Sequence, residues 1–142
     1  MQRHPSELAS RWLEQCDRNL TDARDLLERD RFHLACFLSQ QAAEMSLKAA
    51  LVWFRGDYPR VHLIRTLIEE LAATEWPLPD DVARRARTLD KFYTTTRYPD
   101  ALDYALPAEA FTPAEAAEAL EIAENVANRV HAALDPHIGA SP

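Results

Sequence analysis

Three polar side chains recur at helical spacing inside an otherwise apolar segment, residues 38–54. At about 100° per residue, Gln41, Glu44 and Lys48 fall in one narrow sector of a helix. Leaving such groups buried without partners is costly, so we interpret them as the polar lining of a cleft. Lys48 would face a phosphate and Gln41 a base or sugar, with Glu44 orienting Lys48. The alternative is an ordinary Glu44–Lys48 ion pair at a wet edge or subunit seam, worth only ~0.3–0.5 kcal/mol.

Arg97 and Tyr98, in the segment TTTRYPDA, form a second group of side chains that could bind a ligand. A guanidinium binds phosphate through two parallel N–H bonds, and a tyrosine ring offers a surface on which a base can stack. We predict that both residues line the same nucleotide- or phosphate-binding site as the polar sector. In the alternative interpretation Arg97 pairs with Asp90 or Asp100 to hold its loop, and Tyr98 packs on the bundle.

His62 and a basic row are weaker candidates. A histidine at the start of a helix can cap it, bind phosphate or transfer a proton, because histidine changes charge near neutral pH. Arg84, Arg87 and Lys91 share one helix face and are the predicted contact for RNA or an acidic partner, although most such rows are simply solvated. Histidine–carboxylate spacings of the HExxH kind do not occur. We therefore expect no metal and no other cofactor.

Composition excludes several classes of protein. The 142 residues carry a net charge of −7, opposite to the basic field of general nucleic-acid-coating proteins. With only Gly56 and Gly139, the glycine-rich motifs of Rossmann and P-loop sites cannot be built. Cys16 and Cys36 form no CxxC pair and are expected to be small buried hydrophobes in a reducing cytosol. The start of the chain is too polar for a signal peptide and no apolar run approaches ~18 residues, so we expect a soluble cytoplasmic protein without membrane contact.

The elements that must position these groups are all predicted to be helical, since strand and hairpin signals are absent. Apolar periodicity predicts helices at about 5–28, 31–55, a short one led by His62, 80–93, and a last one from 113. Asp30 is predicted to cap the second helix and Gly56 to end it. Thr112 and Glu115 are spaced as a capping box for the last helix. A long loop, residues 94–111, precedes it, and loops of this length are often functional.

The predicted fold is therefore all-α, an antiparallel up-and-down four-helix bundle with one short additional helix. It would form a single domain over residues 1–136, with a disordered tail at 137–142. The last helix carries two adjoining alanine-rich stripes, wide enough to serve the core and a subunit contact together. This width supports one interpretation of function, a purely structural protein-interaction adaptor.

A combination of segments points to a known family. QQAAEMSLKAAL, HLIRTLI, LDKFYTTTRYPDA and an alanine-rich terminal helix follow one another in the chain. In this order, from about Trp12 to Val130, the sequence resembles the HEPN domain family of prokaryotic nucleotide-binding proteins. The resemblance implies an all-α bundle that commonly dimerises and is often encoded beside a minimal nucleotidyltransferase, as a two-component, toxin–antitoxin-like module. Several branches of the family are metal-independent ribonucleases, with an arginine and a histidine four to six residues apart in a cleft built across a dimer.

The ribonuclease motif is not found in the expected place. Arg97 matches the arginine of the RYPD branch, but the residues that follow it, YPDALDY, contain no histidine. Arg55 and His62 have a suitable spacing, but they span the turn between two helices and enclose Pro59, so we interpret that match as chance. The leading hypothesis is a homodimeric, or higher homo-oligomeric, module that recognises a nucleotide or a nucleotidyltransferase protein and is not an enzyme. The alternative is a ribonuclease toxin acting on RNA, with Arg97 and His62, or a histidine of a second subunit, as catalytic candidates.

Overall fold

The predicted helical bundle is confirmed in the computed structural model, which describes residues 5–102 and 105–138. All regular structure in these residues is helical. The long helices are α1 (Pro5–Glu28), α2 (Phe32–Arg55) and α6 (Pro113–Ile138). The fourth is a nearly continuous segment made of α4 (Asp80–Arg87), the 3₁₀ turn η1 (Thr88–Lys91) and α5 (Phe92–Thr95), and α3 (Ile64–Ala72) is the short additional helix. Two further 3₁₀ turns, η2 (Pro99–Ala101) and η3 (Pro107–Glu109), lie in the segment predicted as a long loop.

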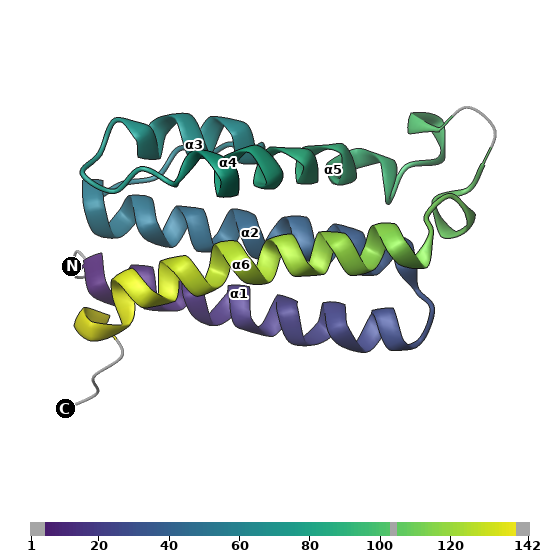
Figure 1. Cartoon of the computed structure of the whole chain (residues 1–142), viewed down its shortest axis with the longest axis horizontal. Coiled ribbons are helices and arrows are strands. Elements are labelled where there is room, and N and C mark those ends of the chain that lie inside the picture. Colours follow the sequence, from purple (N-terminus) through teal and green to yellow (C-terminus); the bar gives the residue numbers. More distant parts are fainter. Residues whose placement is uncertain (1–4, 103–104, 139–142) are drawn as a thin grey trace.

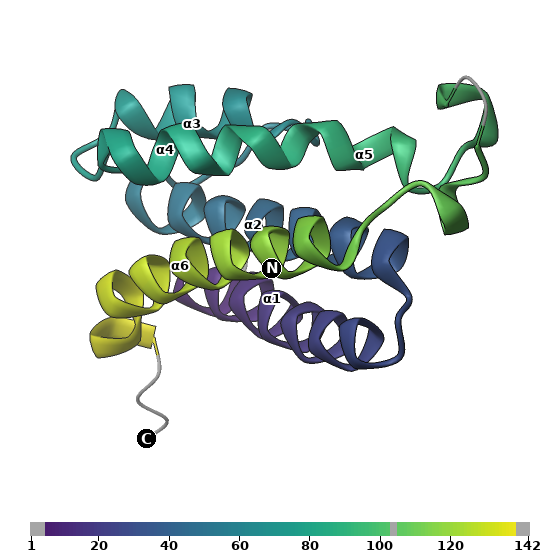
Figure 2. The same cartoon turned by 45° about the vertical axis from the view of Figure 1, so that its right-hand side comes forward.

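The helices alternate in direction, as an up-and-down bundle requires. In Figure 1, α1 and the α4–α5 segment run one way, and α2 and α6 run the other. Figure 2 shows α3, α4 and α5 as a layer over one side of α2, with α6 and α1 on the other side. α2 packs against α1, α6 and α3 and is therefore the central helix. In the part of the chain that the structure describes, no helix is both long and apolar enough to cross a membrane.

The connection between α1 and α2 corrects the prediction for Asp30. This residue has a φ of 60°, the left-handed conformation that commonly ends a helix. Its N–H donates to the carbonyl of Leu27, and the N–H of Arg31 donates to that of Leu26. Asp30 therefore terminates α1, and Arg31 occupies the N-cap position of α2 without a side-chain cap bond. In a connection this short, an acidic residue can either end the first helix or cap the second, and the sequence looks the same in both cases.

The last helix begins as predicted but ends later. The Thr112 hydroxyl accepts from the N–H of Glu115, whose carboxylate accepts from the N–H of Thr112, so the capping box is confirmed. Both alanine-rich stripes are used mainly in the core, where α6 packs against α1, α2 and α4. Their role in the core is therefore confirmed, and a subunit contact through α6 stays a prediction. α6 also includes His137, whose ring stacks on Trp53 at 5.2 Å, so the predicted tail is wrong at its first two residues. Residues 139–142 lie outside the described part of the chain.

His131 links α6 to α1 through two carboxylates. Its Nε2 lies 2.8 Å from Asp17 and its Nδ1 lies 2.8 Å from Asp135. Burial alone would lower the pKa of His131, but the hydrogen bonds and negative charges of Asp135 and Asp17 outweigh it and raise the pKa above 6.5. Because the folded pKa exceeds the unfolded one, this stabilisation is fully present below the unfolded pKa and is lost as pH rises through the folded pKa.

We expect the native protein to be more stable to unfolding than His131→Gln at acidic pH, and this difference in free energy to shrink as the pH rises above the unfolded pKa of about 6.5. Urea unfolding of both proteins at a series of pH values measures this difference directly. His137→Gln serves as the control, because no carboxylate contacts that ring in the described residues. A difference for His131→Gln that stayed constant as the pH rises would contradict the proposed role of its charge.

Candidate functional site

In the predicted polar sector of α2, Glu44 and Lys48 are buried within the chain and Gln41 is half-buried. Glu44 is 1% exposed and Lys48 is 4% exposed, and the Lys48 ammonium lies 2.9 Å from Oε2 of Glu44. The ammonium also lies over the rings of Trp12 and Tyr58, at 5.4 and 5.8 Å from their centroids. Trp12 and Tyr58 meet edge to face at 5.0 Å and so cover the pair. The Glu44–Lys48 ion pair of the alternative interpretation is therefore observed, but it is buried and does not lie at a solvent-exposed edge. In this conformation Lys48 does not reach a ligand directly.

Glu44 also holds His62, which lies in the segment that crosses over α2. Nδ1 of His62 is 3.2 Å from Oε2 of Glu44. The backbone carbonyl of His62 accepts from Nε2 of Gln40, whose Oε1 accepts from Nε2 of Gln41. Gln41 also donates to Oε1 of Glu44 at 3.3 Å. One side of the imidazole is thus held by the buried carboxylate of Glu44, while the His62 side chain remains 55% exposed.

Tyr93 connects His62 to Arg97. The rings of His62 and Tyr93 stack at 5.0 Å with an interplanar angle of 14°. The Arg97 guanidinium lies 4.8 Å from the Tyr93 ring, 4.5 Å from Phe37 and 4.9 Å from Tyr98. Nε of Arg97 donates to the Tyr93 carbonyl at 3.0 Å, and Nη2 donates to the same oxygen. The structure therefore brings together the polar sector of α2, His62 and Arg97, which are far apart in the sequence.

Arg97 keeps much of its binding capacity. Among the described residues it has no carboxylate partner, so the predicted pairing with Asp90 or Asp100 is not observed. Asp90 instead accepts from the backbone N–H groups of Ile64 and Arg65 and so caps α3. Two of the five N–H groups of the guanidinium are used, and about three are left for a ligand. Tyr98 is 49% exposed beside them. A fixed guanidinium with an open aromatic neighbour can bind a phosphate and an adjoining planar group.

The other sequence candidates lie elsewhere. Arg84, Arg87 and Lys91 are exposed on α4 and η1. Their contact with RNA or an acidic partner stays a prediction. Burial, followed by the negative charge of Asp17, raises the pKa of Cys16 to about 12, and burial, followed by Glu115, does the same for Cys36. Both thiols therefore stay protonated, as expected of structural cysteines. The described residues contain no group of three histidine, cysteine or acidic side chains placed to hold a metal ion.

Tyr98 was predicted from the sequence, but four other aromatic residues of the site were not. Tyr93 joins its two halves, Phe37 supports Arg97, and Trp12 and Tyr58 enclose Lys48. Each stands at an apolar position of its helix or turn, where a core role is the usual interpretation. One signal was available: Phe37 lies one helical turn before Gln41, on the same face.

Comparisons with known proteins agree with this fold. The sequence profile of the HEPN domain matches residues 9–133. No functionally curated protein matches. The crystal structure of TT1696 from Thermus thermophilus is similar with a TM-score of 0.82 and 38% identity, covering 87% of this chain and 96% of that one.

Two further crystal structures are also similar. ST0689, an archaeal HEPN homologue, gives a TM-score of 0.74 and 34% identity, covering 94% of this chain and 99% of that one. An HEPN domain protein from Thermotoga maritima gives 0.69 and 25% identity, covering 88% and 98%. An all-α bundle with these matches defines a HEPN-type fold, and the chain belongs to the HEPN domain family.

Proposed function

We propose that this chain is a nucleotide-binding interaction module of the HEPN family. The observation that supports it is the Arg97 guanidinium, held among three aromatic rings and without a carboxylate partner in the described residues. In this proposal Arg97 binds a phosphate and Tyr98 stacks on the base. Gln41 and His62 border the same surface, whereas Glu44 and Lys48 support it from below.

The burial of Lys48 changes the role expected for it. Its ammonium already has a carboxylate and two aromatic faces as partners, so contact with a phosphate would break a buried ion pair. Lys48 therefore acts on the site through Glu44, whose Oε2 it shares with His62. The surface offered to a nucleotide consists of Gln41, His62, Tyr93, Arg97 and Tyr98.

The test is a thermal-shift measurement with ATP, GTP, their diphosphates and a short RNA. A nucleotide at about 100 times its dissociation constant adds ~2.7 kcal/mol of stability, which raises the melting temperature of a domain of this size by several degrees. We expect this shift to be lost in Arg97→Ala and strongly reduced in Arg97→Lys, because lysine lacks the planar fork. Arg18→Ala is the matched control, since Arg18 is an exposed arginine of α1 that pairs with Glu14. No shift with any ligand, or equal shifts in all four proteins, would overturn the proposal.

Family membership supports two further parts of the proposal. The chain would form a homodimer or higher homo-oligomer, and it would act with a minimal nucleotidyltransferase in a two-component, toxin–antitoxin-like system. Light scattering of the purified protein tests the first part. Co-purification with a nucleotidyltransferase encoded beside the gene tests the second part. A chain that stays monomeric would contradict the first part, and a chain that does not bind the nucleotidyltransferase would contradict the second.

A ribonuclease is the second candidate, and the Glu44–His62 contact favours it. A carboxylate accepts hydrogen bonds, so Nδ1 of His62 is the donor in this contact, and in the neutral imidazole Nε2 is then the nitrogen that accepts a proton from a ribose hydroxyl. Arg97, across Tyr93, would stabilise the charge of the attacked phosphate. Cleavage of RNA by the purified protein, abolished by Arg97→Ala and by His62→Gln, would support this function. RNA left intact after long incubation would exclude it.

A further inference from the structure

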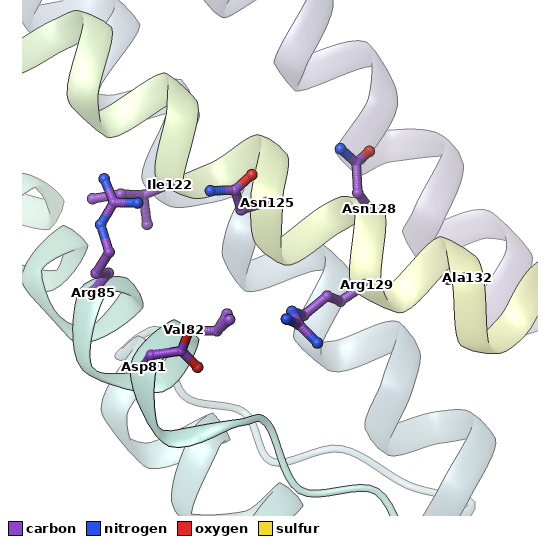
Figure 3. Close-up of a pocket in the computed structure, with 8 residues that line it drawn as sticks. All are labelled: Asp81, Val82, Arg85, Ile122, Asn125, Asn128, Arg129 and Ala132. Atoms are coloured by element: carbon purple, nitrogen blue, oxygen red, sulfur yellow. The ribbon is translucent and has the colours of Figure 1, made fainter.

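A second concave region lies between α4 and α6, away from Arg97. It has a volume of about 440 Å³ and takes side chains from both helices. Figure 3 shows Arg85 reaching from α4 and Arg129 reaching from α6 toward the space between the two helices, with Asn125 between them. Asp81 and Val82, from the first turn of α4, border the same space. A pocket of this size matches the usual range for small-molecule sites, roughly 300–1,000 Å³.

The two arginines are available to a ligand. Arg129 has no ion-pair or hydrogen-bond partner in the part of the chain that the structure describes. Arg85 approaches Glu121 only to 3.8 Å, and both side chains are largely open to solvent, at 43% and 65% exposed. An exposed pair of this kind contributes little stability, so the Arg85 guanidinium is easily released. Figure 3 shows the two guanidinium groups apart in the groove, with Arg85 beside Ile122 and Arg129 farther along α6. Because neither side chain is held by a strong partner, both can turn toward one doubly charged oxyanion and bind it in a bidentate manner.

The remaining lining indicates what the anion is attached to. Val82 and Ile122 supply an apolar wall for a sugar or a ring. Asn125 can both donate and accept, and the Asp81 carboxylate accepts hydrogen bonds from hydroxyl or amino groups. A carboxylate beside two arginines would repel a long polyanion, and the chain as a whole carries a charge of −7. This combination favours a small ligand with one phosphate group over nucleic acid.

We propose that the pocket between α4 and α6 binds a small phosphate monoester with a hydroxyl-bearing body, such as a sugar phosphate or a nucleoside monophosphate. Arg85 and Arg129 hold the phosphate, and Asp81 accepts from a hydroxyl of the body. The site is separate from the Arg97 surface, because Arg97 follows α5 whereas the pocket lies between α4 and the middle of α6.

Isothermal titration calorimetry with ribose 5-phosphate, AMP, inorganic phosphate and ribose tests this site. Ribose 5-phosphate or AMP is expected to bind more tightly than phosphate alone, and ribose is expected not to bind. The double variant Arg85→Gln/Arg129→Gln should weaken binding of the phosphorylated probes at least about tenfold for each arginine removed. Comparison of AMP with ribose 5-phosphate shows whether the base adds to recognition. Asp81→Asn should weaken ribose 5-phosphate but leave inorganic phosphate unchanged or slightly tighter.

The matched control is Arg84→Gln/Arg87→Gln, which removes two arginines from the same helix outside the pocket. It should leave affinity for ribose 5-phosphate and AMP unchanged. Circular dichroism and the melting temperature show that each variant is folded. Absence of binding up to about 10 mM of either monoester would overturn the proposal. Equal losses in the pocket and control variants, or binding by a short RNA only, would overturn it as well, whatever the result at Arg97.

Discussion

Lys48→Met is expected to lower the free energy of unfolding by about 3–5 kcal/mol, because it leaves a buried carboxylate without its counter-charge. The Glu44 side chain is 2% exposed, so water cannot replace the lost ammonium. Methionine keeps most of the volume of the lysine stem under Trp12 and Tyr58, which limits the effect to the charge. Urea unfolding of both proteins at the same pH measures the loss.

A double variant separates charge from packing. Glu44→Gln/Lys48→Met removes both charges and should recover much of the stability lost in the single variant. Arg24→Met is the exposed control, since the Arg24–Glu124 pair has side chains that are 49% and 36% exposed. Its loss should stay within ~1 kcal/mol. If Lys48→Met cost no more than this control, the buried pair would not be a major determinant of stability.

Asp90→Ala is expected to cost about 2–3 kcal/mol, since hydrogen bonds to charged groups each contribute ~1.5–3 kcal/mol and partly overlap here. Its two carboxylate oxygens accept from the N–H groups of Ile64 and Arg65 at 2.6 and 3.1 Å. Without Asp90, the first turn of α3 loses its cap, because Leu63 at the N-cap position supplies no side-chain bond. Thermal and urea unfolding measure the stability change.

The same substitution should also affect the candidate site. Asp90 ties the start of α3 to the segment that carries Tyr93, and His62 immediately precedes that start. Loosening this tie would weaken the His62–Tyr93 stack and lower the affinity of any ligand at Arg97. Asp100→Ala is the matched control, because Asp100 is exposed and should change stability by less than ~0.5 kcal/mol. An Asp90→Ala protein as stable as this control would refute the capping role.

Local patterns in the sequence were sufficient to predict most of the fold. The boundaries of α1 and α2 followed from apolar periodicity and from Gly56, whose φ of 92° ends α2. The capping box of α6 involves residues three apart, so its chemistry is visible in the sequence. The prediction that Asp30 caps α2 was wrong, because an acidic residue between two helices can end the first or begin the second, and the sequence does not distinguish these roles.

The candidate site was predictable only in part, because its contacts are long-range. The spacing of Glu44 and Lys48 predicted their pairing, but not that Trp12 and Tyr58 would enclose it. Likewise, capping its own helix was one of the roles considered for His62, whereas Asp90 caps that helix through Ile64, 26 residues away in the sequence. The space between Arg85 and Arg129 depends on how α4 packs against α6, and no local pattern encodes that.

The three-residue connection between α1 and α2 also has a kinetic consequence. Short loops close at a small entropic cost, so these two helices can meet early in folding. α6 packs against the same central helix from the far end of the sequence, and its contacts form only after a much longer loop has closed. The α1–α2 hairpin is therefore the expected folding nucleus. Substitutions between its helices should slow folding, whereas substitutions on α6 should mainly speed unfolding.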